Sequence, residues 1–447
     1  MTQLVTLNAQ GCASPPPAPP PVVHLVRGER PLAFLVEGSR LFGLDREFFA
    51  LLESGDLWAQ QELLAVAGPA PRQGVFDSGL PDPTAISLNI SQSCNLSCSY
   101  CYADEGRFGG RARFMTLEVA RSAIDRLIDG ARGRRITVGF IGGEPFLNRE
   151  VLYRSVEYAR ERAHEHGCAV GFSVTTNGTL VSRSDAAMLR DHAFSVSVSL
   201  DGDAEINDRH RRARSGLSGF QEALRSLRPL LENPGKARIA ARATVTRQDL
   251  CIAERVSALC DAGFLEAGVS PLRTSPDASL VLHGEDWARL LDEMIRAAEE
   301  EWRRISSGHG FRFSNLANAM KQLHAGSAKP LPCGSAANYV SVSAEGGYFT
   351  CHRTIDDRRF ALGTTTAGLS TVAREDFLKV RHVDMQEPCR NCWARYLCGG
   401  GCHAEVIQAG RSGCDYIRGW LDYCLRFYDR VLQTRPGLLE PQPEVTR

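Results

Sequence analysis

Short apolar runs alternate with stretches of helical spacing through the middle of the chain. After a good N-cap at Thr116, for example, Leu117, Ile124 and Ile128 fall on one face of a predicted helix. The apolar runs predict strands at Ala85–Ser91, Ile136–Ile141, Val170–Thr175, Ser195–Leu200, Ile239–Val245 and Ala267–Pro271. Repeated strand–helix units imply a parallel sheet, so the sequence predicts an α/β fold with a partial (β/α)6 barrel over residues 84–325.

The chain before this region has a different pattern. Apolar runs at Val22–Val26, Leu32–Val36 and Leu41–Leu44 predict strands, and the leucines that follow have helical spacing. We therefore expect a small domain over residues 22–80, closed by a Gly- and Pro-rich linker, residues 68–83. Residues 1–21 end in a proline run and are expected to form a disordered arm.

A long charged helix, Glu285–Ile305, is predicted after the last strand–helix unit. From Pro332 the chain lacks regular periodicity and is rich in Cys and Gly, which is typical of a fold stabilised by metal centres. We expect a separate domain over residues 330–432 that ends in a helix, Asp415–Leu432, and a tail over residues 433–447.

Composition narrows the class of protein. The 447 residues carry 52 Lys plus Arg and 52 Asp plus Glu, a balance that argues against binding nucleic acid or a membrane surface. No signal peptide or long apolar run is visible, so a cytoplasmic location is expected. The 15 cysteines are an odd number in a chain without a secretion signal, which favours metal or cluster binding over disulfides.

Three cysteines, Cys94, Cys98 and Cys101, lie on one loop directly after the first predicted strand of the barrel. Three thiolates can hold three corners of a four-iron cluster and leave the fourth iron open. A zinc knuckle is the alternative, but it requires a fourth nearby Cys or His.

The Cys-x3-Cys-x2-Cys spacing, with Tyr100 before the last cysteine, resembles the signature of the radical S-adenosylmethionine (radical SAM) enzymes. The resemblance implies that Cys94, Cys98 and Cys101 hold a catalytic [4Fe-4S] cluster whose open iron chelates S-adenosylmethionine. Reductive cleavage of that cofactor gives a 5'-deoxyadenosyl radical, which abstracts hydrogen from an unactivated carbon.

Motifs at the ends of the next strands resemble the cofactor-binding segments of the same family. The resemblance implies a cofactor-binding role for Tyr100, Gly142, Gly143, Glu144, Pro145, Thr176, Asn177, Ser199, Asp201 and Arg209. Glu144 is expected to face the ammonium group of the cofactor. Several arginines crowd around Arg209, so the sequence leaves open which of them meets the cofactor.

The segment after Pro332 contains more cysteines than one structural zinc ion could bind. It resembles the SPASM domain, which holds two auxiliary [4Fe-4S] clusters. By that resemblance Cys333, Cys351 and Cys402 hold the first. The second takes Cys389, Cys392, Cys398 and a later cysteine, for which Cys414 is favoured over Cys424. We expect Cys168, Cys251 and Cys260 to be buried inert thiols and Cys12 to be a free thiol.

Residues 22–66 resemble the winged-helix-like peptide-recognition domain of enzymes that modify ribosomally made peptides. The segments Trp393–His403 and Gly413–Leu421 resemble the maturases of quinohemoprotein amine dehydrogenase and, less closely, the ranthipeptide maturases. These resemblances imply thioether formation on a precursor peptide, with electrons from a flavodoxin or ferredoxin. The alternatives are carbon–carbon cross-linking, formylglycine formation in a sulfatase, and a non-enzymatic iron–sulfur electron-transfer or scaffold protein.

Overall fold

The computed structural model describes residues 22–68, 79–213, 216–326 and 328–440. The expected arm with Cys12, most of the expected linker and the end of the expected tail lie outside this part of the chain. Within it, no helix combines the length and the apolar character that crossing a membrane requires.

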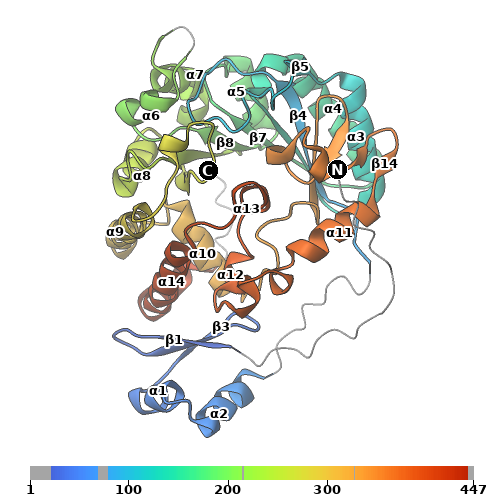
Figure 1. Cartoon of the computed structure of the whole chain (residues 1–447). Coiled ribbons are helices and arrows are strands. Elements are labelled where there is room, and N and C mark those ends of the chain that lie inside the picture. The colour runs from blue at the N-terminus through green and yellow to red at the C-terminus, as the bar shows by residue number, and fades with distance from the viewer. Residues whose placement is uncertain (1–21, 69–78, 214–215, 327, 441–447) are drawn as a thin grey trace, which may run out of the picture.

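Parallel strands form the centre of the molecule. They are β4 (Ala85–Gln92), β6 (Ile136–Gly142), β7 (Val170–Thr176), β8 (Ser195–Ser199), β9 (Arg238–Val245) and β10 (Glu266–Pro271). They pair in parallel in the order β10-β9-β8-β7-β6-β4, and the sheet curves into an open arc (Figure 1). The sequence prediction of these strands is confirmed, because their apolar side chains are buried against the helices outside the arc.

The helices between these strands cover the outer face of the arc (Figure 1). They are α3 (Leu117–Ala131), α4 (Arg149–Glu165), α5 (Arg183–Asp191), α6 (Ala204–His210), α7 (Gly219–Glu232) and α8 (Ile252–Asp261). The Thr116 side chain accepts a hydrogen bond from the backbone N–H of Val119, and Ile124 and Ile128 are buried. The N-cap and the apolar face predicted for α3 are therefore confirmed.

The chain after Pro332 continues the same sheet. Strand β11 (Tyr339–Val342) pairs in parallel with β4 and is followed by β12 (Gly347–Phe349), β13 (Ala361–Thr364) and β14 (Gly368–Leu369), while the short β5 (Arg113–Phe114) also pairs with β4. We expected a separate domain from residue 330 onward, but its first strands instead extend the sheet of the barrel. The β4–β11 contact includes a hydrogen bond of 2.7 Å between the hydroxyls of Ser87 and Ser341, a pairing too distant in sequence for local patterns to reveal.

The remaining helices complete the C-terminal half. They are α9 (Asp286–Ser306), α10 (Ser314–His324), α11 (Thr371–Arg381), α12 (Arg395–Cys398), α13 (His403–Ala409) and α14 (Cys414–Thr434). The long helices expected near 285–305 and 415–432 are confirmed as α9 and α14. Helix α13 lies on the inner side of the arc (Figure 1).

The N-terminal unit is an antiparallel sheet followed by two helices. Strands β1 (Val23–Val26), β2 (Leu32–Leu35) and β3 (Arg40–Gly43) precede α1 (Arg46–Glu53) and α2 (Leu57–Ala67). Ala33, Leu52 and Leu63 form a small core inside this unit, whereas Leu32 and Phe34 belong to the main core of the molecule. The sheet thus packs its own helices on one face and the rest of the protein on the other.

Candidate active site

Most of the expected site residues lie at the carboxyl ends of the parallel strands. The loop with Cys94, Cys98 and Cys101 follows β4, Gly143 follows β6, and Asn177 follows β7. Because the strands are parallel, these ends meet at one edge of the sheet, where α/β folds bind their ligands.

A cavity of about 370 Å³ lies at this edge. The expected site residues that line it are Cys94, Cys98, Tyr100, Cys101, Gly142, Gly143, Thr176, Asn177 and Ser199. Four others are not among its lining residues, namely Glu144, Pro145, Asp201 and Arg209. The structure therefore brings the three thiols together with the glycine motif and the hydroxyl groups of β7 and β8.

The glycines of the Gly142–Pro145 motif let the cysteine loop approach β6. A Cβ atom on Gly143 would lie 2.3 Å from the carbonyl oxygen of Ser93 and 3.0 Å from Cβ of Cys94. Gly106 has φ of +88°, and a Cβ there would lie 2.5 Å from Cα of Gly143. A larger side chain at either position would displace the loop that carries the thiols.

The carboxylate of Glu144 binds internal donors, and Glu144 is not among the residues that line the cavity. Its Oε1 accepts hydrogen bonds from the Thr176 hydroxyl at 2.8 Å and the Phe146 N–H at 3.2 Å, and its Oε2 accepts from the Asn177 N–H at 2.8 Å. The side chain is fully buried, and this burial raises the pKa of the carboxyl to about 7. Glu144 thus fixes the end of β7, and its contact with the ammonium group of the cofactor stays a prediction.

Asp201 lies behind the cavity wall and holds two of the residues that line it. Its Oδ2 accepts a short hydrogen bond from the Tyr100 hydroxyl, and its Oδ1 lies 3.1 Å from Nε of Arg211. The Arg211 guanidinium also lies over the Tyr100 ring, 5.2 Å from its centroid. Asp201 is buried and acts as the counter-charge that keeps Arg211 at the cavity.

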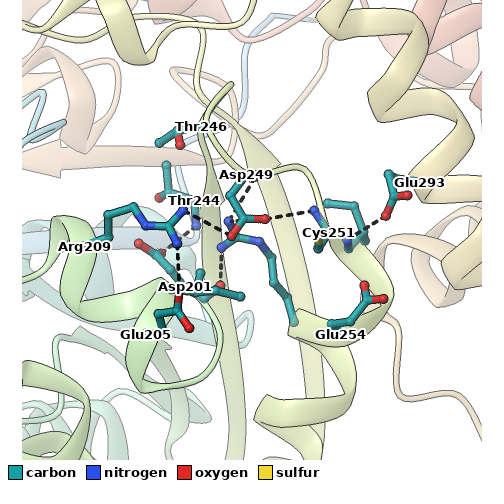
Figure 2. A network of polar contacts seen from close by, with 12 residues as sticks. Asp201, Glu205, Arg209, Thr244, Thr246, Asp249, Cys251, Glu254 and Glu293 are labelled. Carbon is teal, nitrogen blue, oxygen red and sulfur yellow. Dashed lines mark hydrogen bonds and ion pairs between the residues drawn. The ribbon is translucent and has the colours of Figure 1, made fainter.

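Arg209 lies between two carboxylates outside the cavity. Its guanidinium is 3.4 Å from Glu205 and 3.6 Å from Asp249. Figure 2 shows Arg209 beside these two side chains. Helix α6 ends at His210, and the following Arg211 reaches the cavity instead. Arg209 is therefore not among the residues that line the cavity, whereas Arg211 is, and which arginine binds the cofactor stays a prediction.

The C-terminal cysteines surround a second cavity, of about 770 Å³. The cysteines that line it are Cys333, Cys389, Cys392, Cys398, Cys402 and Cys414. Burial raises the pKa of the Cys333 and Cys351 thiols, and an electrostatic interaction with the nearby Cys402 raises it further. The same kind of interaction links Cys389 and Cys398 to Cys392 and Cys414. The thiols thus fall into two groups.

Cys424 lies apart from both groups. It is fully buried inside α14, where burial raises the pKa of its thiol well above the usual range. Of the other expected inert thiols, Cys168 and Cys260 are half-buried, whereas Cys251 is exposed and the expectation of burial is wrong for it. Cys251 stands at the N-cap of α8, where the strand-to-helix turn is open to solvent.

Across the described ranges, no three His, Cys, Asp or Glu side chains are grouped as ligands of one metal ion. Each thiolate of a four-iron cluster binds a different iron, so cluster ligands need not converge on a single point. The cluster-binding role of the cysteines stays a prediction.

Sequence reasoning missed Arg353 and Glu405, which connect the two cavities. Glu405 is the one described residue that lines both, and its Oε1 accepts a hydrogen bond of 2.9 Å from Arg353. Arg353 in turn lies over the ring of Tyr102, 4.7 Å from the centroid. The positions of Arg353 two residues after Cys351 and of Glu405 three residues after Cys402 were the only sequence signals available.

Residues 88–251 match the model of the Radical SAM superfamily. The chain carries a radical SAM domain. The match begins within β4 and covers the three-cysteine loop, the glycine motif and Arg211.

Similar radical SAM proteins include named maturases. The chain is 26% identical over 347 residues to a serine-type anaerobic sulfatase-maturating enzyme of Klebsiella aerogenes, covering 74% of this chain and 82% of that enzyme. It is 27% identical over 370 residues to the mycofactocin maturase MftC of Mycolicibacterium smegmatis, covering 79% of this chain and 87% of that one. No relative named for quinohemoprotein or ranthipeptide maturation is among these, so that finer resemblance stays a prediction.

Solved structures share the fold. The enzyme anSMEcpe, with bound AdoMet and a Kp18Cys peptide, superposes with a TM-score of 0.67 at 20% identity and covers 79% of this chain and 99% of its own. Streptococcus suis SuiB bound to S-adenosylmethionine superposes with a TM-score of 0.51 at 13% identity and covers 87% of this chain and 98% of its own. The radical SAM fold with its parallel sheet is therefore established.

Proposed function

We propose that this radical SAM enzyme modifies a ribosomally made peptide by hydrogen abstraction from a side chain. The observation that carries the proposal is the convergence of Cys94, Cys98 and Cys101 on one cavity at the carboxyl edge of the sheet, inside the region that matches the superfamily.

The donor set of this cavity fits a [4Fe-4S] cluster and S-adenosylmethionine. Iron in such clusters prefers thiolate ligands, and three cysteines leave one iron for the cofactor. When bound, the pair supplies a 5'-deoxyadenosyl radical. Around it, Gly142 and Gly143 leave room for backbone approach, and Arg211, held by Asp201, offers a guanidinium to the carboxylate of the cofactor. Thr176 and Ser199 also line this cavity, and the Ser199 hydroxyl supplies a further polar contact.

The C-terminal thiols support two auxiliary [4Fe-4S] clusters. We assign Cys333, Cys351 and Cys402 to the first and Cys389, Cys392, Cys398 and Cys414 to the second, following the two groups of interacting thiols. Held by these thiols, the clusters would supply an acceptor for the electron that a substrate radical must lose to become a stable product. An external flavodoxin or ferredoxin would supply the reducing electron.

Residues 22–80 are assigned to recognition of the precursor peptide, next to the radical SAM barrel over 84–325 and the SPASM segment over 330–432. Support comes from the small sheet and its two helices, and from relatives that act on peptides, since one solved neighbour holds a Kp18Cys peptide. A cytoplasmic location accords with such a substrate.

The bond we favour is a thioether between a peptide cysteine and a carbon of another residue. The resemblance of the Trp393–His403 segment to thioether-forming maturases supports it. A second candidate is oxidation of a Ser or Cys to formylglycine, because serine-type and cysteine-type sulfatase-maturating enzymes are among the relatives.

Co-expression of the enzyme with small peptides encoded beside its gene, followed by mass spectrometry, tests the proposal. A thioether removes a pair of hydrogen atoms and one alkylatable thiol, whereas formylglycine gives an aldehyde that reacts with a hydrazide. A carbon–carbon link would lower the mass but leave the thiol alkylatable. Peptides that stay unmodified while the cofactor is cleaved would contradict the assignment of a peptide substrate from this locus.

A further inference from the structure

Cys94 differs from the other two thiols of the three-cysteine loop in its hydrogen bonds. Its Sγ accepts from the backbone N–H of Leu96 at 3.5 Å and from Nδ2 of Asn177 at 3.7 Å. In the part of the chain that the structure describes, no hydrogen bond reaches Sγ of Cys98 or Cys101. One thiolate of the expected cluster therefore receives a side-chain N–H from another strand end.

Asn177 is held so that its amide must point at this sulfur. Its Oδ1 accepts from the Thr179 N–H at 2.9 Å and from the Thr179 hydroxyl at 2.7 Å. Its Nδ2 also donates to Oδ1 of Asn95 at 2.9 Å, and its backbone N–H donates to buried Glu144 at 2.8 Å. The side chain is 6% exposed, so water does not compete for these bonds. Three hydrogen bonds to Thr179 and Asn95 therefore fix the orientation of the amide, in addition to its contact with the sulfur.

A hydrogen bond to a cluster sulfur stabilises the reduced cluster, which carries one more negative charge, more than the oxidised one. We propose that Asn177 is a positioning residue that raises the reduction potential of the three-cysteine cluster through its N–H···Sγ contact with Cys94. This inference rests on the proposed function, and it gives Asn177 and Glu144 a role toward the cluster rather than toward the cofactor. Glu144 acts one step further away, by fixing the backbone of Asn177.

The test is a redox titration of the reconstituted full-length enzyme, followed by electron paramagnetic resonance. The signal of interest is the one that disappears in the C94A/C98A/C101A enzyme. Asn177→Leu removes the donor without adding charge, and the ratio of reduced to oxidised cluster at a fixed potential should fall about threefold to tenfold. A tenfold fall corresponds to a shift of about 59 mV for one electron.

Thr179→Val is the matched control. It removes the hydroxyl that bonds Asn177 and Asn95, but the backbone N–H of residue 179 and Oδ1 of Asn95 still orient the Asn177 amide toward Cys94, so the potential should stay at the wild-type value. A wild-type potential in Asn177→Leu, or an equal shift in Thr179→Val, would overturn the inference.

A second variant covers the case in which Asn177→Leu does not fold. Asn177→Asp keeps the acceptor that Thr179 uses, loses the donor and adds a negative charge, so its potential should fall further; an unchanged potential again overturns the inference. Iron analysis distinguishes a failure of the proposed cluster from a failure of the role proposed for Asn177. If C94A/C98A/C101A loses no iron, the proposed cluster itself is refuted, whereas a present cluster with an unshifted potential refutes the role of Asn177 alone.

Discussion

The imidazole of His24 stacks on the indole of Trp393, with ring centroids 3.7 Å apart and planes 3° from parallel. The His24 Nε2 also lies within hydrogen-bonding distance of Asp422, at 2.9 Å. Trp393 follows Cys392 and lines the larger cavity. The N-terminal unit is therefore in direct contact with the loop that carries one group of C-terminal thiols.

His24→Ala should lower the free energy of unfolding by about 1–2 kcal/mol, because it removes an aromatic stack and a hydrogen bond at a mostly buried interface. Chemical denaturation followed by tryptophan fluorescence measures the effect. His24→Phe keeps the stack and loses only the contact with Asp422, so it should destabilise less. A His24→Ala protein as stable as the wild type would show that the contact does not hold the two parts together.

Replacing Cys94, Cys98 and Cys101 together by Ala should remove about four irons per chain and abolish cleavage of S-adenosylmethionine, while the auxiliary irons stay. Iron analysis after anaerobic reconstitution gives the count. Loss of all iron would instead mean that the barrel and the C-terminal thiols assemble as one unit.

Cys414 and Cys424 should differ in their effect on iron content. Cys414→Ala should lose up to about four irons per chain, because its thiol interacts with those of Cys389 and Cys398. Cys424→Ala removes a thiol buried in α14 and should keep the full iron content. The reverse result would move the last ligand of the second auxiliary cluster to Cys424.

Substitutions of Arg209 and Arg211 should have different effects on the affinity for S-adenosylmethionine. Arg211→Lys keeps the charge but loses the planar guanidinium, and the dissociation constant for S-adenosylmethionine should rise about tenfold or more. Arg209→Lys alters a residue that binds Glu205 and Asp249, so affinity should stay near the wild-type value. Equilibrium dialysis with the reconstituted enzyme measures both; equal losses would place Arg209 at the cofactor as well.

The strands of the barrel could be predicted from sequence because each is an apolar run buried on the helix side, as at Ile136 and Val138. The clustering of thiols could likewise be read from their spacing. The direction in which a side chain points could not be predicted from the sequence. Arg209 and Arg211 are the same residue type and lie two positions apart. Only the end of α6 at His210 decides which of them turns toward Asp201.

Contacts between segments that are distant in the sequence could not be predicted from local sequence patterns either. The pairing of β11 with β4 joins residues on either side of the whole barrel, and its short strands carry no periodic signal of their own. Glu144 illustrates the same limit on a smaller scale. A carboxylate beside two glycines suits an external ammonium group, but here three internal donors already occupy its oxygens.

Formation of 5'-deoxyadenosine tests the central claim most directly. The reconstituted enzyme is reduced anaerobically with S-adenosylmethionine, and the products are separated by liquid chromatography. We predict 5'-deoxyadenosine together with methionine from the wild-type enzyme and none from C94A/C98A/C101A. Absence of 5'-deoxyadenosine from a wild-type enzyme whose clusters are intact and reduced would contradict the account.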